Sequence, residues 1–169
     1  ETREFLGIVT KVSASGEPVE DSVTFPNGTQ QIRNLKDKTF RTLGPHASEP
    51  TLMFMDKYPP GSAKSITITE GAYDAASIRE ALGPNFPAVS VRSSSSARKD
   101  CVAGFKYLDS FQTIYLALDA DEPGQKAARA IAELFDFNKV FHVDLGALKD
   151  ANGYLQADMG TQLRQVWHN

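Results

Sequence analysis

The sequence predicts an α/β protein: a mostly parallel four-stranded sheet with flanking helices, preceded by a small β-rich N-terminal subdomain. Strand-like and helix-like segments alternate over residues 65–169, a pattern typical of parallel strands joined by crossover helices. Residues 1–64 are instead irregular and rich in turn-forming residues. The length of 169 residues fits one main domain with a small companion. We therefore expect a boundary between the two parts at residues 64 and 65.

A β-hairpin is the clearest element of the N-terminal part. Val23–Phe25 and Thr29–Leu35 flank Pro26-Asn27-Gly28, and an Asn-Gly pair accepts the positive φ angles of a tight turn. A further short strand is expected over 38–44, with basic residues alternating outward. The Pro-rich segment 58–61 is expected to link this part to the next.

The C-terminal part supplies the elements of the parallel sheet. Its expected strands are 66–69, 89–91, 113–118 and 140–143, and its expected helices are 73–82, 97–108 and 123–135. The strand at 113–118 is almost wholly apolar, which predicts a central position covered on both faces. The last helix has a proline in its first turn and an Ala-rich body, both favourable to helix formation.

Composition excludes several classes of protein. Eighteen basic and 21 acidic residues give a net charge of −3, which is a poor overall signature of a nucleic-acid binder. The single cysteine, Cys101, excludes an internal disulfide and, with only three histidines, a zinc finger or ribbon within this chain. No apolar run approaches the roughly 20 residues of a membrane span, and no secretory leader is visible. A cytoplasmic location is therefore expected.

Four carboxylates follow predicted strands. Glu70 follows the first strand of the C-terminal part, Asp119 and Asp121 follow the third, and Asp150 lies in the loop after the fourth. Because the carboxyl ends of parallel strands meet at one edge of a sheet, we expect these groups to lie close together. Clustered carboxylates repel one another, and a divalent cation such as Mg²⁺ removes that repulsion. The pattern therefore favours a metal site with one ion or two neighbouring ions.

Two of these carboxylates also have a specific structural interpretation. Asp121 stands two residues before Pro123 and can cap the following helix, while Glu70 stands before Gly71 and can be an exposed turn residue. On the residues alone, metal-assisted phosphate chemistry and a purely structural role are about equally supported.

Three segments resemble the motifs of Toprim domains. Glu70-Gly71-Ala72-Tyr73-Asp74 resembles the first motif, and Asp119-Ala120-Asp121 followed by Gly124 and a helix resembles the second. Lys149-Asp150-Ala151-Asn152 resembles the third region of bacteriophage primase–helicases and their mitochondrial helicase relatives. The strand and small-residue loop over 89–97 are also similar to those of primases. The resemblance covers roughly residues 25–152 and points to the RNA-polymerase domain of a bacteriophage-type DNA primase.

This resemblance implies metal-dependent synthesis of short RNA primers from NTPs on a single-stranded DNA template, with two Mg²⁺ or Mn²⁺ ions. Asp119 and Asp121 would be the main catalytic ligands, and Asp150 a further ligand toward the triphosphate. Glu70 would be either a ligand or a general acid/base. Asp74, one helical turn beyond Glu70, either orients the site or merely begins a helix.

Phosphate groups also need positive charge near the metal. The residues expected to hold template or nucleotide phosphates are Arg33, Lys38, Arg92, Arg98, Lys99 and Lys149. The loop 93–96 consists of four serines, and it is either an anion site or a flexible polar loop. Lys126 is expected to face solvent.

The chain also departs from the primase pattern. Gly153 stands where such primases usually carry an acidic residue, which predicts a weaker position for one metal ion. The sequence has neither a zinc-binding module nor a Gly-x-x-x-x-Gly-Lys-Ser/Thr loop, so helicase and zinc-binding modules are expected elsewhere in a longer chain or in trans. The first residue is Glu1 rather than Met, which is what we expect of a fragment of a longer chain. The location would be the bacterial host cytoplasm for a phage protein, or an organelle.

Two alternative functions remain open. The same carboxylates would serve a Toprim nuclease by activating water. The domain would otherwise be a non-catalytic DNA-binding module of a replicative helicase. A topoisomerase is disfavoured because nothing in the sequence supplies its separate tyrosine module.

Overall fold

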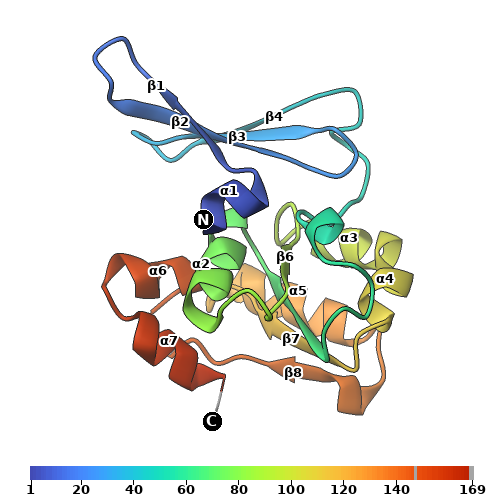
Figure 1. The fold of residues 1–169 in the computed structure, drawn as a ribbon. Coiled ribbons are helices and arrows are strands. Elements are labelled where there is room, and N and C mark those ends of the chain that lie inside the picture. The colour runs from blue at the N-terminus through green and yellow to red at the C-terminus, as the bar shows by residue number, and fades with distance from the viewer. Residues whose placement is uncertain (147, 168–169) are drawn as a thin grey trace. The chain divides into compact units, whose positions relative to one another are not determined.

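The structure, a computed structural model, describes residues 1–146 and 148–167 (Figure 1). The chain forms two compact units, Glu1–Glu49 and Pro50–Asn169. This division lies earlier than the boundary expected after residue 64. None of the described helices is long and apolar enough to cross a lipid bilayer.

The first unit is an antiparallel sheet. Its strands are hydrogen-bonded in chain order, and the elements are helix α1 (Thr2–Leu6) and strands β1 (Val9–Val12), β2 (Pro18–Thr24), β3 (Gln30–Asn34) and β4 (Phe40–Leu43). The predicted hairpin is confirmed as the β2–β3 pair. Its turn is closed by a 2.7 Å hydrogen bond from Phe25 N to Thr29 O, and Gly28 supplies the positive φ of 83° that the turn requires.

The segment between residue 50 and the second sheet belongs to the second unit because it is apolar and buried. Leu52, Met53 and Phe54 are at most 1% exposed, and Met53 forms an antiparallel bridge with Ser90. A short 3₁₀ helix, η1 (Met55–Lys57), leads to Tyr58, which is also buried. The Pro-rich segment 58–61 is therefore not an interdomain linker, because it lies inside the second unit.

The second unit contains the predicted parallel sheet, in the order β6-β5-β7-β8. Its strands are β5 (Ser65–Thr69), β6 (Ala88–Ser90), β7 (Thr113–Ala117) and β8 (Val140–His142). All three pairings are parallel, so the predicted α/β architecture is confirmed. The apolar strand β7 is central, as predicted. The remaining elements are α2 (Ala72–Leu82), α3 (Ala97–Ala103), α4 (Phe105–Asp109), α5 (Glu122–Ala132), η2 (Phe137–Lys139), α6 (Ala151–Gln156) and α7 (Gly160–Val166).

Two features of the helices differ from the sequence prediction. The helix expected over 97–108 is divided into α3 and α4 at Gly104, where a side chain would lie 2.6 Å from Leu52 Cδ1. The close approach of Leu52 explains the glycine, and the glycine favours the break. Helices α6 and α7 were not predicted, although Asp150 and the backbone N–H of Gly153 form a typical helix N-cap at 2.7 Å.

Candidate metal centre

The carboxyl ends of β5 and β7 bring three carboxylates together. The two strands are direct neighbours and end in register, with Thr69 opposite Ala117. Glu70 directly follows β5, while Asp119 and Asp121 lie between β7 and α5. One carboxylate oxygen from each of these three residues lies within 4.8 Å of the others. Three residues that are distant in sequence therefore form one cluster, which we call the acidic cluster.

Burial and mutual repulsion disfavour charge on two members of the acidic cluster. Desolvation raises the pKa of Glu70, the charges of Asp119 and Asp121 raise it further, and a hydrogen bond from the Ser94 side chain opposes the rise. Desolvation also raises the pKa of Asp119, against the opposing effect of Lys149. A positive charge placed among these groups would therefore be strongly favoured.

Asp121 has two roles in the structure. Its Oδ1 accepts a 3.0 Å hydrogen bond from the backbone N–H of Gly124, which makes it the N-cap of α5. This hydrogen bond is the main reason that the pKa of Asp121 is lowered, and Lys149 lowers it further. The second oxygen, Oδ2, faces Lys149. Asp121 therefore both caps α5 and belongs to the acidic cluster.

Lys149 supplies a positive charge to the acidic cluster. Its Nζ lies 2.9 Å from Asp119 Oδ2 and 3.1 Å from Asp121 Oδ2. Hydrogen bonds to these two carboxylates raise the pKa of Lys149, so it remains protonated. The sequence had suggested that Lys149 contacts nucleotide or DNA. In the structure its ammonium group bridges the two aspartates.

Asp150 lies beside the acidic cluster without joining it. Its Oδ1 caps α6 through the backbone N–H of Gly153, and its charge contributes to the raised pKa values of Asp119 and Asp74. The group of oxygens within 4.8 Å of one another does not include Asp150.

Asp74 is bonded to helix α6 and feels the charges of the acidic cluster. It lies in the first turn of α2, and its Oδ1 accepts a 3.0 Å hydrogen bond from the backbone N–H of Asn152. Desolvation, aided by the charges of Asp150, Asp119 and Glu70, raises its pKa to about 7. The sequence left open whether Asp74 orients the site or merely begins a helix, and its position in the structure favours the first role.

Replacing Asp74 by Asn is expected to stabilise the metal-free protein at alkaline pH. Because the folded-state pKa of Asp74 lies above its ordinary value, its contribution to stability is fully present below pH 3.8 and is lost as pH rises through about 7. Asn retains the acceptor oxygen and carries no charge. The melting temperature of Asp74→Asn should therefore exceed that of the wild type at about pH 9, and the difference should narrow toward about pH 5.

Glu80→Gln, an exposed change on the same helix, is the matched control for Asp74→Asn. The prediction would be contradicted if Asp74→Asn melted at or below the wild-type temperature at alkaline pH.

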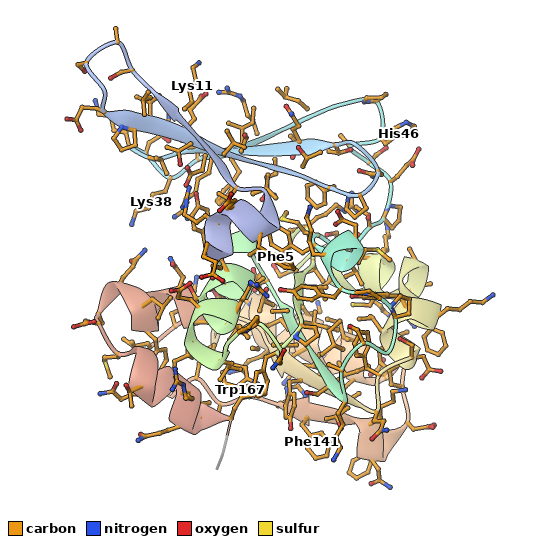
Figure 2. The ribbon with its side chains drawn as sticks, viewed as in Figure 1. Phe5, Lys11, Lys38, His46, Phe141 and Trp167 are labelled. Carbon is orange, nitrogen blue, oxygen red and sulfur yellow. The ribbon has the colours of Figure 1, made fainter. Side chains whose placement is uncertain are left out.

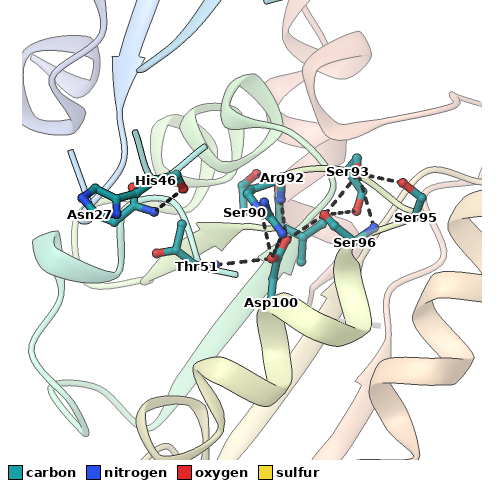
Figure 3. Close-up of polar contacts among 10 residues, drawn as sticks. Asn27, His46, Thr51, Ser90, Arg92, Ser93, Ser95, Ser96 and Asp100 are labelled. Atoms are coloured by element: carbon teal, nitrogen blue, oxygen red, sulfur yellow. Dashed lines mark hydrogen bonds and ion pairs between the residues drawn. The ribbon is translucent and has the colours of Figure 1, made fainter. Parts of the chain in front are cut away.

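The basic residues predicted on the second unit fall into two groups. Arg92 is engaged in the interior, where its Nε and Nη2 each lie 2.8 Å from Asp100 Oδ1 (Figure 3). Arg98 and Lys99 are exposed on α3. Arg98 also lines a groove of about 550 Å³ between α3 and α5, together with Ser95 and Lys126. Lys126 is exposed, as expected, but its position on this groove was not anticipated.

Arg33 and Lys38 lie on the first unit. The guanidinium carbon of Arg33 lies 5.4 Å from the centre of the Phe40 ring, a cation–π contact across the β3–β4 pair. Lys38 is exposed and has a positive φ of 60° just before β4 (Figure 2).

Sequence reasoning missed two interactions of the second unit. The Ser94 side chain lowers the pKa of Glu70, against the effect of burial, and Asp100 pairs with Arg92 in the interior. The position of Ser94 after β6 was a usable signal, because loops at the carboxyl edge of a parallel sheet converge. Nothing in the local sequence distinguishes Asp100 from an ordinary residue on a helix surface.

The residues of the acidic cluster fit a hard divalent cation. All three offer carboxylate oxygens, the donors preferred by Mg²⁺ and Mn²⁺. Glu70 Oε2 is buried and has no hydrogen-bond partner among the residues that the structure describes. A buried, unpartnered carboxylate oxygen is costly, and coordination to a cation would remove that cost.

Residues 67–155 match the protein family described as Toprim-like. The DNA helicase/primase of Enterobacteria phage T3 is 34% identical over 142 residues, which are 83% of this chain and 24% of that protein. The chain therefore spans about a quarter of the length of this curated relative.

Two solved structures also resemble this chain. The primase fragment of the bacteriophage T7 primase-helicase protein has a TM-score of 0.84 and 29% identity, covering 98% of this chain and 69% of that one. The second structure is bacteriophage T7 lagging-strand DNA polymerase interacting with primase domains bound to an RNA/DNA hybrid and dTTP. One of its chains has a TM-score of 0.82 and 29% identity, covering 99% of this chain and 85% of that one.

Proposed function

Because this chain belongs to the Toprim-like family, we propose that it is the RNA-polymerase domain of a DNA primase. It joins ribonucleotides into short primers on a single-stranded DNA template. The observation that carries the proposal is the acidic cluster, whose oxygens lie within 4.8 Å of one another at the ends of two adjacent parallel strands. The similarity to a helicase/primase and to a primase fragment favours primer synthesis among the Toprim activities.

Glu70, Asp119 and Asp121 would hold Mg²⁺ or Mn²⁺, with Asp150 beside them. When bound, the ions would stabilise negative charge on the attacking and leaving oxygens of phosphoryl transfer. Asp121 is fixed by its capping bond to α5, so its other oxygen, Oδ2, is presented in a defined direction. Glu70, with its raised pKa, is suited either to ligation or to accepting the proton of the attacking hydroxyl group.

We assign the nucleotide's triphosphate tail to the groove between α3 and α5. Arg98 and Lys126 offer two positive charges there and Ser95 a hydroxyl group. The groove volume of about 550 Å³ is that of a small-molecule site. Glu122, which follows Asp121 directly, also lines the groove, so a bound tail would begin beside the acidic cluster. Arg33, Lys38 and Lys99 remain proposed contacts to template phosphates.

A primer-extension assay tests the proposal. The protein is incubated with a single-stranded DNA template carrying a short annealed RNA, labelled NTPs, and Mg²⁺ or Mn²⁺. Supplying the RNA removes the need for a separate template-reading module. Extension of the RNA supports the primase assignment. Shortening of the DNA without use of NTPs would instead identify a nuclease, and DNA binding without either product would identify a non-catalytic module.

Replacing Lys149 by Gln is expected to strengthen Mn²⁺ binding severalfold and to slow primer extension. The Lys149 ammonium group competes with a metal ion for the Asp119 and Asp121 oxygens that it now contacts. Once displaced by an ion, it is free to contact the nucleotide, as the sequence suggested, and Gln would lack the charge for that contact. Titration of Mn²⁺ followed by electron paramagnetic resonance measures the affinity.

Lys106→Gln, which removes an exposed charge on α4, should leave the Mn²⁺ affinity unchanged. Equal or weaker Mn²⁺ binding by Lys149→Gln would show that Lys149 does not compete with the ion.

A further inference from the structure

An exposed aromatic ring lies at the start of β4, in the first unit. Phe40 is 56% exposed. Its cross-strand partner on β3 is Arg33, whose guanidinium carbon lies over the ring, 5.4 Å from the ring centre. A cation held over an aromatic ring is attracted to it, so Arg33 helps to fix the orientation of the ring. Because Arg33 covers one face, the exposed area of Phe40 lies on the rest of the ring, where a planar ligand can stack.

The turn between β3 and β4 is held by hydrogen bonds of its own. Asn34 Oδ1 accepts from the backbone N–H groups of Lys36 at 2.9 Å and Asp37 at 3.3 Å. Asp37 Oδ1 in turn accepts from the backbone N–H of Thr39 at 3.0 Å and from its Oγ1 at 2.6 Å. Lys36 and Lys38 are both exposed. The turn therefore presents two lysine side chains to solvent, while its one carboxylate is bonded within the turn.

Lys38 has a backbone conformation that favours other residues. Its φ of 60° lies in the left-handed region, which glycine adopts without steric cost and which a Cβ atom disfavours. Backbone strain of this kind is concentrated at functional sites. The Lys38 side chain is exposed (Figure 2), so packing does not require it. What the turn gains from a lysine at this position is an exposed positive charge.

Arg41, the next basic residue, is engaged on the other side of the sheet. Its Nη1 lies 2.8 Å from Glu20 Oε1, and because side chains alternate along a strand, Arg41 and Phe40 lie on opposite faces.

An open aromatic ring beside exposed lysines is the combination that binds single-stranded nucleic acid. Bases stack on aromatic rings, and the phosphates between them contact basic side chains. A duplex offers no such base, because its bases already stack on one another. The chemistry of the β3–β4 hairpin therefore fits an unpaired strand.

We propose that the β3–β4 hairpin binds the single-stranded DNA template, with one base stacked on Phe40 and the neighbouring phosphates at Lys36 and Lys38. The identity of the strand as a template rests on the proposed primase function, whereas the binding of single-stranded DNA does not. Because every base has a stacking face, the site would hold a template without selecting its sequence.

The first test measures the affinity for a labelled oligothymidylate of about 15 nucleotides by fluorescence anisotropy. Phe40→Ala should weaken binding about tenfold, the loss typical of a base-stacking residue. Phe40→Leu keeps the apolar bulk but lacks an aromatic face, so it should lose nearly as much, whereas Phe40→Trp should bind at least as well as the wild type. Leu43→Ala is the matched control, because Leu43 is 48% exposed on the same strand but lies on the opposite face.

A probe with abasic sites in its middle distinguishes stacking from contact with the DNA backbone. It should bind the wild type more weakly than oligothymidylate does. Phe40→Ala should bind this probe as tightly as the wild type, because neither protein then has a base to stack.

Lys38→Gly separates a role in binding from a role in the fold. It should weaken oligothymidylate binding and reduce the slope of log affinity against log salt concentration by about 0.7, the value for one phosphate contact on a single strand. Its melting temperature should equal or exceed that of the wild type, because glycine relieves the strain at this φ. A purely structural role for Lys38 predicts a lower melting temperature and an unchanged slope.

The proposal is overturned if the wild type does not bind oligothymidylate, or if Phe40→Ala or Phe40→Leu binds it as tightly as the wild type does. It is also overturned if Phe40→Ala weakens binding of the abasic probe as much as binding of oligothymidylate. Tighter binding of oligouridylate than of oligothymidylate would assign the ring to an RNA strand and refute the template assignment. A protein that binds single-stranded DNA as expected but extends no primer would refute the primase function alone.

Discussion

Replacing Asp119 by Asn will slow primer extension by at least about a thousandfold, which corresponds to roughly 4 kcal/mol in the activation barrier. Asp119 follows the central strand β7 and contributes one of the three clustered oxygens. Asn offers a neutral, weaker ligand in place of the carboxylate, so both the affinity for the ion and its placement suffer. Extension of a labelled primer under single-turnover conditions measures the loss.

The same change should leave the fold intact. Burial raises the pKa of Asp119, so the ionised group is disfavoured in the folded state and its removal costs little stability. The partner, Lys149, is 60% exposed and can be solvated without it. Thermal melting of Asp119→Asn within a few degrees of the wild type, together with the kinetic loss, would separate a chemical from a structural defect.

Asp144→Asn is the control for Asp119→Asn, since Asp144 also follows a strand of the same sheet but lies outside the acidic cluster. It should extend primers at the wild-type rate. An active Asp119→Asn protein would refute the assignment of the acidic cluster as the metal site.

Replacing Gly124 by Ala is expected to disrupt both stability and activity. A Cβ atom at this position would lie 2.2 Å from the backbone oxygen of Asp119 and 2.9 Å from its carbonyl carbon. The backbone of Asp119 cannot rotate out of the way as a flexible side chain can. The start of α5 must therefore move away from the end of β7 to make room for the added Cβ atom. That movement also breaks the cap between Gly124 and Asp121. We expect the melting temperature to fall by roughly 5 to 10 °C and primer extension to be lost.

Gly160→Ala is the matched control for Gly124→Ala. Gly160 also lies in the first turn of a helix, α7, but its nearest obstacle is Leu155 Cδ2 at 3.2 Å, the end of a side chain that can rotate. The melting temperature of Gly160→Ala should remain close to that of the wild type. A Gly124→Ala protein that melts and extends primers normally would contradict the close approach of α5 to β7.

The parallel sheet and the acidic cluster were predictable because both depend on local sequence patterns. An apolar run such as 113–118 identifies a buried strand. Once the strands are assigned, the topology rule for parallel sheets places Glu70, Asp119 and Asp121 at one edge. The structure agrees, since β5 and β7 are neighbours.

Features that depend on contacts between distant residues were not predictable. The break between α3 and α4 depends on Leu52, a residue far away in sequence that approaches Gly104. The boundary between the two units lies before residue 50 because residues 52–54 are buried in the second unit. From the sequence alone, this short apolar segment cannot be distinguished from part of a loop, because its packing partners are not known. The Arg92–Asp100 pair likewise requires two specific side chains to meet in the interior. The spacing of apolar residues along the sequence carries no information about such side-chain contacts.

The bridge that Lys149 forms has a practical consequence for handling the protein. Because its ammonium group already offsets the repulsion between Asp119 and Asp121, we expect the domain to fold without magnesium. Purification in EDTA should therefore yield an intact, reloadable preparation rather than a precipitate.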